Sequence, residues 1–186
     1  MSEAAPAFGY QQFGRHFFEL AVTEQRVLDA LAGVSGRPVE IGPVGVGPGR
    51  LVRVRATGRV GLAQVAVVEH EHVAFHVRIP VELALVVDLG LEKSRFSAQV
   101  LIHLFPVARP EPPLLIQIDI EPPTPEQIEV AVQPDGAGAS LLHSLAKVDR
   151  EIAKAVAKYV AGKLDEPDTI AARTIDVAAV LRRRLT

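Results

Sequence analysis

An unbroken alternation of apolar and other residues over positions 73–89 constrains the fold of this chain more than any other feature. Every odd position is apolar, namely Val73, Phe75, Val77, Ile79, Val81, Leu83, Leu85, Val87 and Leu89. The even positions include His76, Arg78, Glu82 and Asp88. Successive side chains of a strand point to opposite faces, so the pattern predicts a long strand with one buried and one solvated face. Pro80 lies on the solvated parity, which predicts an edge, a bulge or a bend there rather than a central position in a ladder. Two consecutive strands that are bent at Pro80 are the alternative.

Shorter segments with strand character lie on both sides of it. Alternation recurs over residues 50–60, 96–104, 114–120 and 128–132, and residues 62–68 are apolar on both faces. The short connections between these segments predict an antiparallel meander, which gives a sheet over residues 50–133. The glycine-rich stretch 42–49 is expected to be a loop. It does not predict a phosphate site, because Pro48 lacks an N–H donor and a strand follows where a phosphate-binding helix would be needed.

Two amphipathic helices are predicted outside the sheet. The first covers residues 8–32, and it carries five of the nine aromatic residues of the chain, namely Phe8, Tyr10, Phe13, Phe17 and Phe18. The favoured interpretation is that they cap one end of the core, and the alternative is a segment at a membrane interface or a ligand portal. The second helix covers residues 140–164. It begins at Ser140 as N-cap, and its apolar stripe consists of Leu141, Leu145, Val148, Ile152, Ala155 and Tyr159.

These elements predict a single α+β domain over residues 1–167. A tail with a short helix follows over residues 168–186, and it ends in Arg182, Arg183 and Arg184. The favoured interpretation of the three arginines is favourable charge at the C-terminal end of a helix. An anionic membrane surface and an acidic protein partner are the alternatives.

Composition excludes several classes of function. The net charge of the 186-residue chain is −2, which gives no electrostatic reason to expect nucleic-acid binding. Cysteine is absent, which excludes disulfides, thiolate catalysis and zinc sites built on cysteine. The first residues do not resemble a signal peptide and no run of 18 apolar residues occurs, so we expect a cytoplasmic protein.

No group of residues predicts catalysis, a metal site or a cofactor. His70, His72 and His76 share one parity, but it is the solvated one, so we expect no metal site there. Ser140 and His143 are better explained by a helix cap than by a nucleophile and its base. Asp119 and Glu121 are expected on a solvated strand face. The chain is therefore predicted not to be an enzyme.

The order of an amphipathic helix, long alternating strands and one long amphipathic helix resembles the tubular lipid-binding (TULIP) superfamily. The resemblance covers residues 50–165 and depends on the strand patterns at 73–89, 114–120 and 128–132 and on the helix that follows them. It implies a long, twisted antiparallel sheet that wraps the C-terminal helix and holds a lipid or another elongated apolar ligand between them.

The inward positions of the strands and the helix would line that space. They are Phe75, Val77, Ile79, Val81, Leu83, Leu85, Val100, Ile102, Ile116, Ile118, Leu145, Val148, Ile152 and Val156. The alternative is a structural or assembly protein that holds no ligand and forms homo-oligomers or other complexes through its sheet edges or helices.

Overall fold

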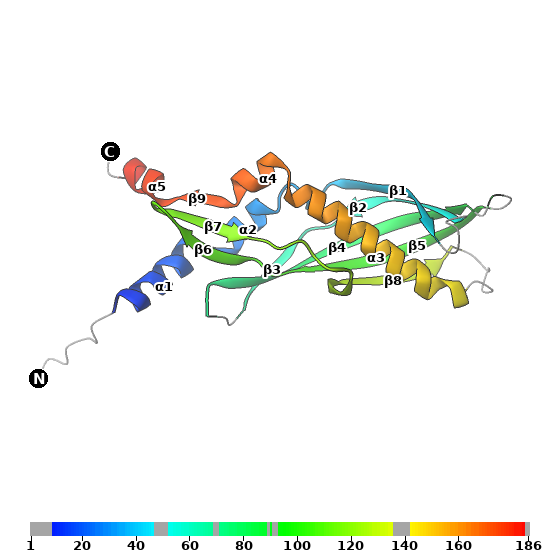
Figure 1. Cartoon of the computed structure of the whole chain (residues 1–186), viewed down its shortest axis with the longest axis horizontal. Coiled ribbons are helices and arrows are strands. Elements are labelled where there is room, and N and C mark those ends of the chain that lie inside the picture. Colours follow the sequence, from blue (N-terminus) through cyan, green and yellow to red (C-terminus); the bar gives the residue numbers. More distant parts are fainter. Residues whose placement is uncertain are drawn as a thin grey trace, which may run out of the picture.

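The chain adopts an α+β fold with a large, curled antiparallel sheet and several helices (Figure 1). This computed structural model describes residues 9–46, 52–68, 71–88, 90, 93–135 and 142–184. The strands are β1 (Pro38–Val46), β2 (Val52–Val60), β3 (Gln64–Val68), β4 (Ala74–Asp88), β5 (Lys93–Leu104), β6 (Val107–Glu111), β7 (Leu115–Asp119), β8 (Ile128–Pro134) and β9 (Thr174–Asp176). The helices are α1 (Tyr10–Ala21), α2 (Glu24–Ala30), the 3-10 turn η2 (Pro125–Gln127), α3 (Leu142–Leu164), α4 (Pro167–Ala172) and α5 (Val177–Arg184).

Strand β4 organises the sheet. It pairs along one side with β5, and β5 pairs in turn with β8. Its other side is shared by β2, which also pairs with β1, and by β3. The sheet continues from Ala74 of β4 through β6 and β7 to β9. The meander predicted over residues 50–133 is therefore correct for β3–β4, β4–β5 and β6–β7, whereas β1 lies before the predicted sheet. The meander is wrong for β2–β4, β5–β8 and β7–β9, which join strands that are not consecutive.

Pro80 lies at the point where two partners of β4 meet. β3 pairs with residues 74–78 of β4 and β2 with residues 81–88. The amide N of Gly61, between β2 and β3, donates to the Pro80 carbonyl at 2.7 Å. The N and C=O of a residue in an antiparallel ladder face the same side, so the missing N–H of Pro80 falls at the break between β2 and β3. β4 continues through it as one strand, and the predicted alternative of two strands is wrong.

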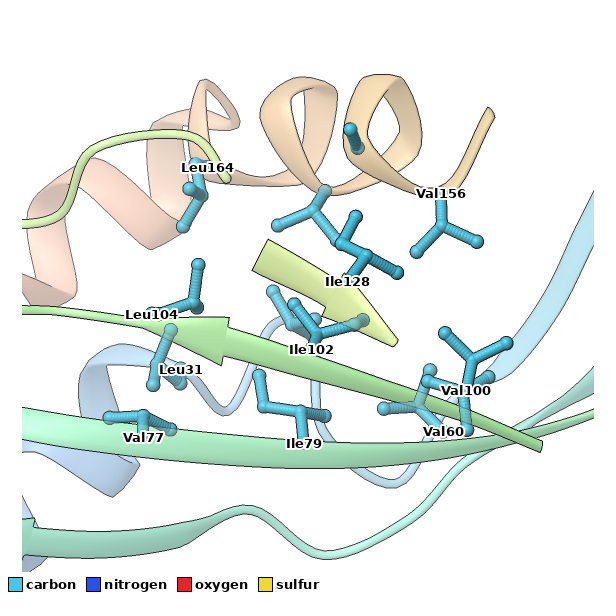
Figure 2. Close-up of a cluster of buried hydrophobic side chains, with 14 of the residues drawn as sticks. Leu31, Val60, Val77, Ile79, Val100, Ile102, Leu104, Ile128, Val156 and Leu164 are labelled. Atoms are coloured by element: carbon cyan, nitrogen blue, oxygen red, sulfur yellow. The ribbon is translucent and has the colours of Figure 1, made fainter. Parts of the chain in front are cut away.

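The core lies between the inward face of the sheet and helix α3. The odd positions of β4 from Phe75 to Val87 are buried, as are the even positions of β5 from Phe96 to Leu104. Figure 2 shows Leu164 of α3 facing Leu104 and Val156 of α3 facing Val100 across this layer. Helix α3 contacts both β8 and β1. The apolar stripe of α3 therefore packs against the inward-facing apolar side chains of the strands.

Two segments differ from their predicted form. The helix predicted over residues 8–32 is divided into α1 and α2 at Val22 and Thr23, where Val22 turns into the core and the Thr23 hydroxyl caps α2 by accepting from the Arg26 amide. Residues 42–46 belong to strand β1 and not to a loop. A shift of register between Ile41 and Val44 lets this glycine-rich segment pair with β2. Residues 47–50 and the predicted cap Ser140 lie outside the described residues.

Candidate functional site

An apolar seam runs between helix α3 and the sheet at strands β1 and β2. We call it the α3 seam. Its lining consists of Ile41 and Val44 of β1, Val54 and Ala56 of β2, and Val148, Glu151, Ile152 and Ala155 of α3. It encloses a cavity of about 20 Å³, which is the space of roughly one water molecule. Helix and sheet therefore pack closely along this seam.

Local sequence patterns bring these side chains to the seam. Val54 and Ala56 alternate with exposed residues of β2, and both are buried. Val148, Ile152 and Ala155 follow each other at intervals of four and three residues, so they lie on one side of α3. β1 is the edge strand of the sheet and contacts α3. The seam thus lies at the β1 edge of the sheet, next to the core.

The single charged residue that lines the seam is engaged within its own helix. Lys154 Nζ donates to Glu151 Oε1 at 2.6 Å. All other residues that line the seam are apolar. The lining of the seam is therefore apolar apart from Glu151.

The opposite flank of α3 carries a carboxylate, Asp149, with one buried oxygen that lacks a hydrogen-bond partner among the described residues. Asp149 lies in a shallow groove with Ile128, Val130 and Ala153, between α3 and β8. Among the described residues, its buried Oδ1 has no hydrogen-bond partner. Burial raises the pKa of the Asp149 carboxyl above its ordinary value. Within the described part of the chain, the carboxylate on the β8 side of α3 thus lacks the hydrogen-bond partner that Glu151 has on the β1 side.

Replacing this carboxylate is expected to stabilise the protein at neutral pH. Asp149→Ala should raise the free energy of unfolding by about 1 kcal/mol, because alanine favours the helix and the desolvated charge is removed. The wild-type group has a raised pKa in the folded state, so its penalty is present at pH 7 and disappears as pH falls through the folded pKa. Denaturant titrations at pH 7 and near pH 4 measure both values.

The exposed helical residue Asp29, which accepts from Gln25 Nε2 at 3.0 Å, supplies the control. Asp29→Ala reports helix propensity without relief of a buried charge. Asp149→Ala should stabilise the protein more than Asp29→Ala at pH 7, and this difference should shrink as pH falls. A difference that stays constant would contradict the interpretation that the Asp149 carboxylate is a destabilising buried charge.

The predicted lining residues are buried, but most of them lie in the packed core and not at the seam. Phe75, Val77, Ile79, Val81, Leu83, Leu85, Val100, Ile102, Ile116, Ile118, Ile152 and Val156 are at most 4 % exposed, apart from Ile152 at 6 %. Val148 is partly buried, and the side chain of Leu145 lies outside the described part of the chain. Among the predicted lining residues whose side chains are described, Val148 and Ile152 line the seam. Ile41 and Val44 were not predicted to line a site, because Gly42 and Pro43 interrupt the strand pattern between them.

His76 contacts a histidine of the neighbouring strand that the sequence did not single out. His76 Nε2 lies 2.8 Å from His103 Nδ1, and His103 Nε2 lies 3.1 Å from Glu129 Oε1. The His76 ring also stacks on Phe105, with 4.9 Å between centroids. Burial, with the charges of His103 and Arg78, holds the pKa of His76 below its ordinary value. These contacts join three adjacent strands or strand ends on the outer face of the sheet.

The other candidate groups give no site in the described part of the chain. His70 and Ser140 lie outside it, as does the side chain of His143. No cluster of three or more histidine or carboxylate side chains suited to a metal ion occurs among the residues that were described. Asp119 Oδ2 lies 3.5 Å from Arg109 Nε, in a surface ion pair. Arg182 lies 4.0 Å from Asp176, while the side chains of Arg183 and Arg184 lie outside the description.

Comparison with known proteins adds no relative. No protein-family model matches the chain, and no curated protein matches its sequence significantly. Among the described helices, none combines the length and the apolar character needed to cross a membrane.

Proposed function

We propose that this protein binds an elongated apolar molecule, such as a lipid acyl chain, between the curled sheet and helix α3. The observation that carries the proposal is the α3 seam, whose lining is apolar except for Glu151. Binding sites for such molecules are lined mainly by apolar side chains, with few polar groups. The seam adjoins the core along an edge strand, which gives a long molecule a route inward.

In this proposal the sheet wraps α3, as the resemblance to the tubular lipid-binding superfamily implies. Its support is that α3 contacts both β1 and β8, which lie on opposite sides of β4 in the order β1, β2, β4, β5, β8. A cavity of about 20 Å³ is far smaller than an acyl chain. Binding therefore requires α3 to separate from β1, and the ligand replaces the apolar contacts that the two elements make with each other.

A fluorescent fatty acid tests the proposal, with a variant that fills the seam. The larger side chain of Ala155→Leu occupies space in the seam that the probe needs, so it should weaken probe binding by about tenfold, which corresponds to about 1.4 kcal/mol. Ala161→Leu makes the same change at another partly exposed position of α3, away from the seam, and should bind like the wild type. Titration of probe fluorescence measures all three proteins.

Native mass spectrometry of the purified protein checks the alternative. A protein that binds no probe, carries no small molecule and is a stable oligomer would contradict ligand binding and support a structural or assembly role. Equal probe affinity for Ala155→Leu and the wild type would place the binding site elsewhere than the seam.

A further inference from the structure

Helix α1 presents a row of apolar side chains to solvent. Tyr10 is 98 % exposed, Phe13 66 % and Leu20 81 %, and no residue of α1 is buried. At 100° per residue, these three residues and the partly buried Phe17 lie within an arc of about 80°. We call these four residues the α1 ridge. Among the described members of that set, the prediction that the aromatic residues cap the core therefore holds for Phe17 and Phe18, which pack against it, and not for Tyr10 and Phe13. Phe8 lies outside the described residues.

The other flanks of α1 are already engaged. Gly14 and Phe18 line a groove together with Val73, which directly precedes β4, and Ala108 of β6. On the polar flank, Arg15 Nε lies 3.1 Å and His16 Nδ1 3.0 Å from the two carboxylate oxygens of Glu19. Apart from Phe17, which packs against the core, the ridge is therefore neither the side that attaches α1 to the sheet nor its charged side.

The composition of this end of the molecule indicates what covers the ridge. Figure 1 shows α1 and α5 at the same end of the long axis. Residues 177–184 carry Arg182, Arg183 and Arg184 and no acidic residue. A helix with a strongly segregated apolar face and low overall hydrophobicity is typical of segments that lie in the interface of a bilayer. Arginines beside such a helix attract anionic headgroups.

We propose that this end of the molecule docks on an anionic lipid bilayer. The α1 ridge enters the boundary between headgroups and acyl chains, and the arginines of α5 contact the headgroups. For the exposed aromatic residues and for the three arginines, the proposal thus adopts the membrane interpretation, which the sequence offered only as an alternative. Docking goes beyond the proposed ligand binding, because the ridge and the α3 seam share no residue.

Flotation with vesicles of phosphatidylcholine and phosphatidylserine tests the proposal. The wild type should float with these vesicles at about 0.1 M salt and much less at about 1 M, where charges are screened within 3 Å. It should float less with vesicles of phosphatidylcholine alone. Phe13→Ser combined with Leu20→Ser should lower the bound fraction at least about tenfold. Replacing the three arginines by glutamine should weaken binding and flatten its dependence on salt.

Leu62 supplies a matched control, because it is 80 % exposed and lies between β2 and β3. Leu62→Ser should float like the wild type, and circular dichroism should show the same thermal transition for every variant. The seam variant Ala155→Leu should also float normally, which separates docking from ligand binding. The proposal is overturned if the wild type does not float with anionic vesicles or if the ridge variant floats equally well. A dimer in solution that Leu20→Ser dissociates, without vesicle binding, would assign the ridge to a second copy of the chain.

Discussion

Val77→Asp should abolish cooperative folding, whereas Val86→Asp on the same strand should leave it intact. Val77 is 0 % exposed and pairs with Val65 of β3 and Leu104 of β5. A carboxylate placed there loses its water and costs several kcal/mol, which is a large part of the 5–15 kcal/mol that stabilises a typical domain.

Val86 makes the comparison informative. It is 37 % exposed on the outward parity of β4, and its cross-strand neighbours are Arg55 of β2 and Arg95 of β5. A carboxylate between two arginines gains about 0.2–1 kcal/mol from each pair. Thermal unfolding followed by circular dichroism distinguishes the two variants. Equal losses at both positions would mean that the inward and outward faces of β4 are assigned incorrectly.

Gly58→Val should be as damaging as the largest single substitutions in proteins, at more than about 4 kcal/mol. Gly58 of β2 lies opposite Leu83, and a Cβ added to it would come within 1.9 Å of the Glu82 carbonyl oxygen. That atom belongs to the backbone of the central strand, so neither partner can move without breaking the ladder between β2 and β4.

Gly162→Ala is the contrasting change. Gly162 is exposed in α3, and a Cβ there would meet nothing within 4 Å. Alanine should therefore stabilise the helix by up to about 1 kcal/mol. Denaturant titration of both variants measures the contrast. A mild effect of Gly58→Val would show that β2 and β4 do not approach as closely as described.

The elements that the sequence predicted well are those in which a periodic apolar pattern continues over many residues. The alternation through Phe75 and Leu85 and the stripe through Ile152 and Val160 each bury one face, and the period identifies that face directly. β1 was missed because Gly42 and Pro43 are typical of a loop. The pairing of β2 with β4 was missed because β3 comes between them in the chain, and sequence order favours consecutive neighbours.

The candidate site shows the same limit. Val148 and Ile152 were predicted because they lie on the stripe of α3, but Ile41 and Val44 join them only through the position of an edge strand. His103 was not recognised as the partner of His76, because their contact depends on the register of β4 against β5. Contacts between distant segments require the register of the sheet, which no local pattern supplies.

The late position of α3 in the chain has a consequence for synthesis on the ribosome. The inward faces of β4 and β5 are complete after residue 104, but the helix that covers them ends at Leu164. During elongation, a broad apolar surface therefore emerges some 60 residues before its cover, at the 5–20 residues per second that are typical of translation. The inward faces of β4 and β5 therefore stay without their helical cover for several seconds during synthesis.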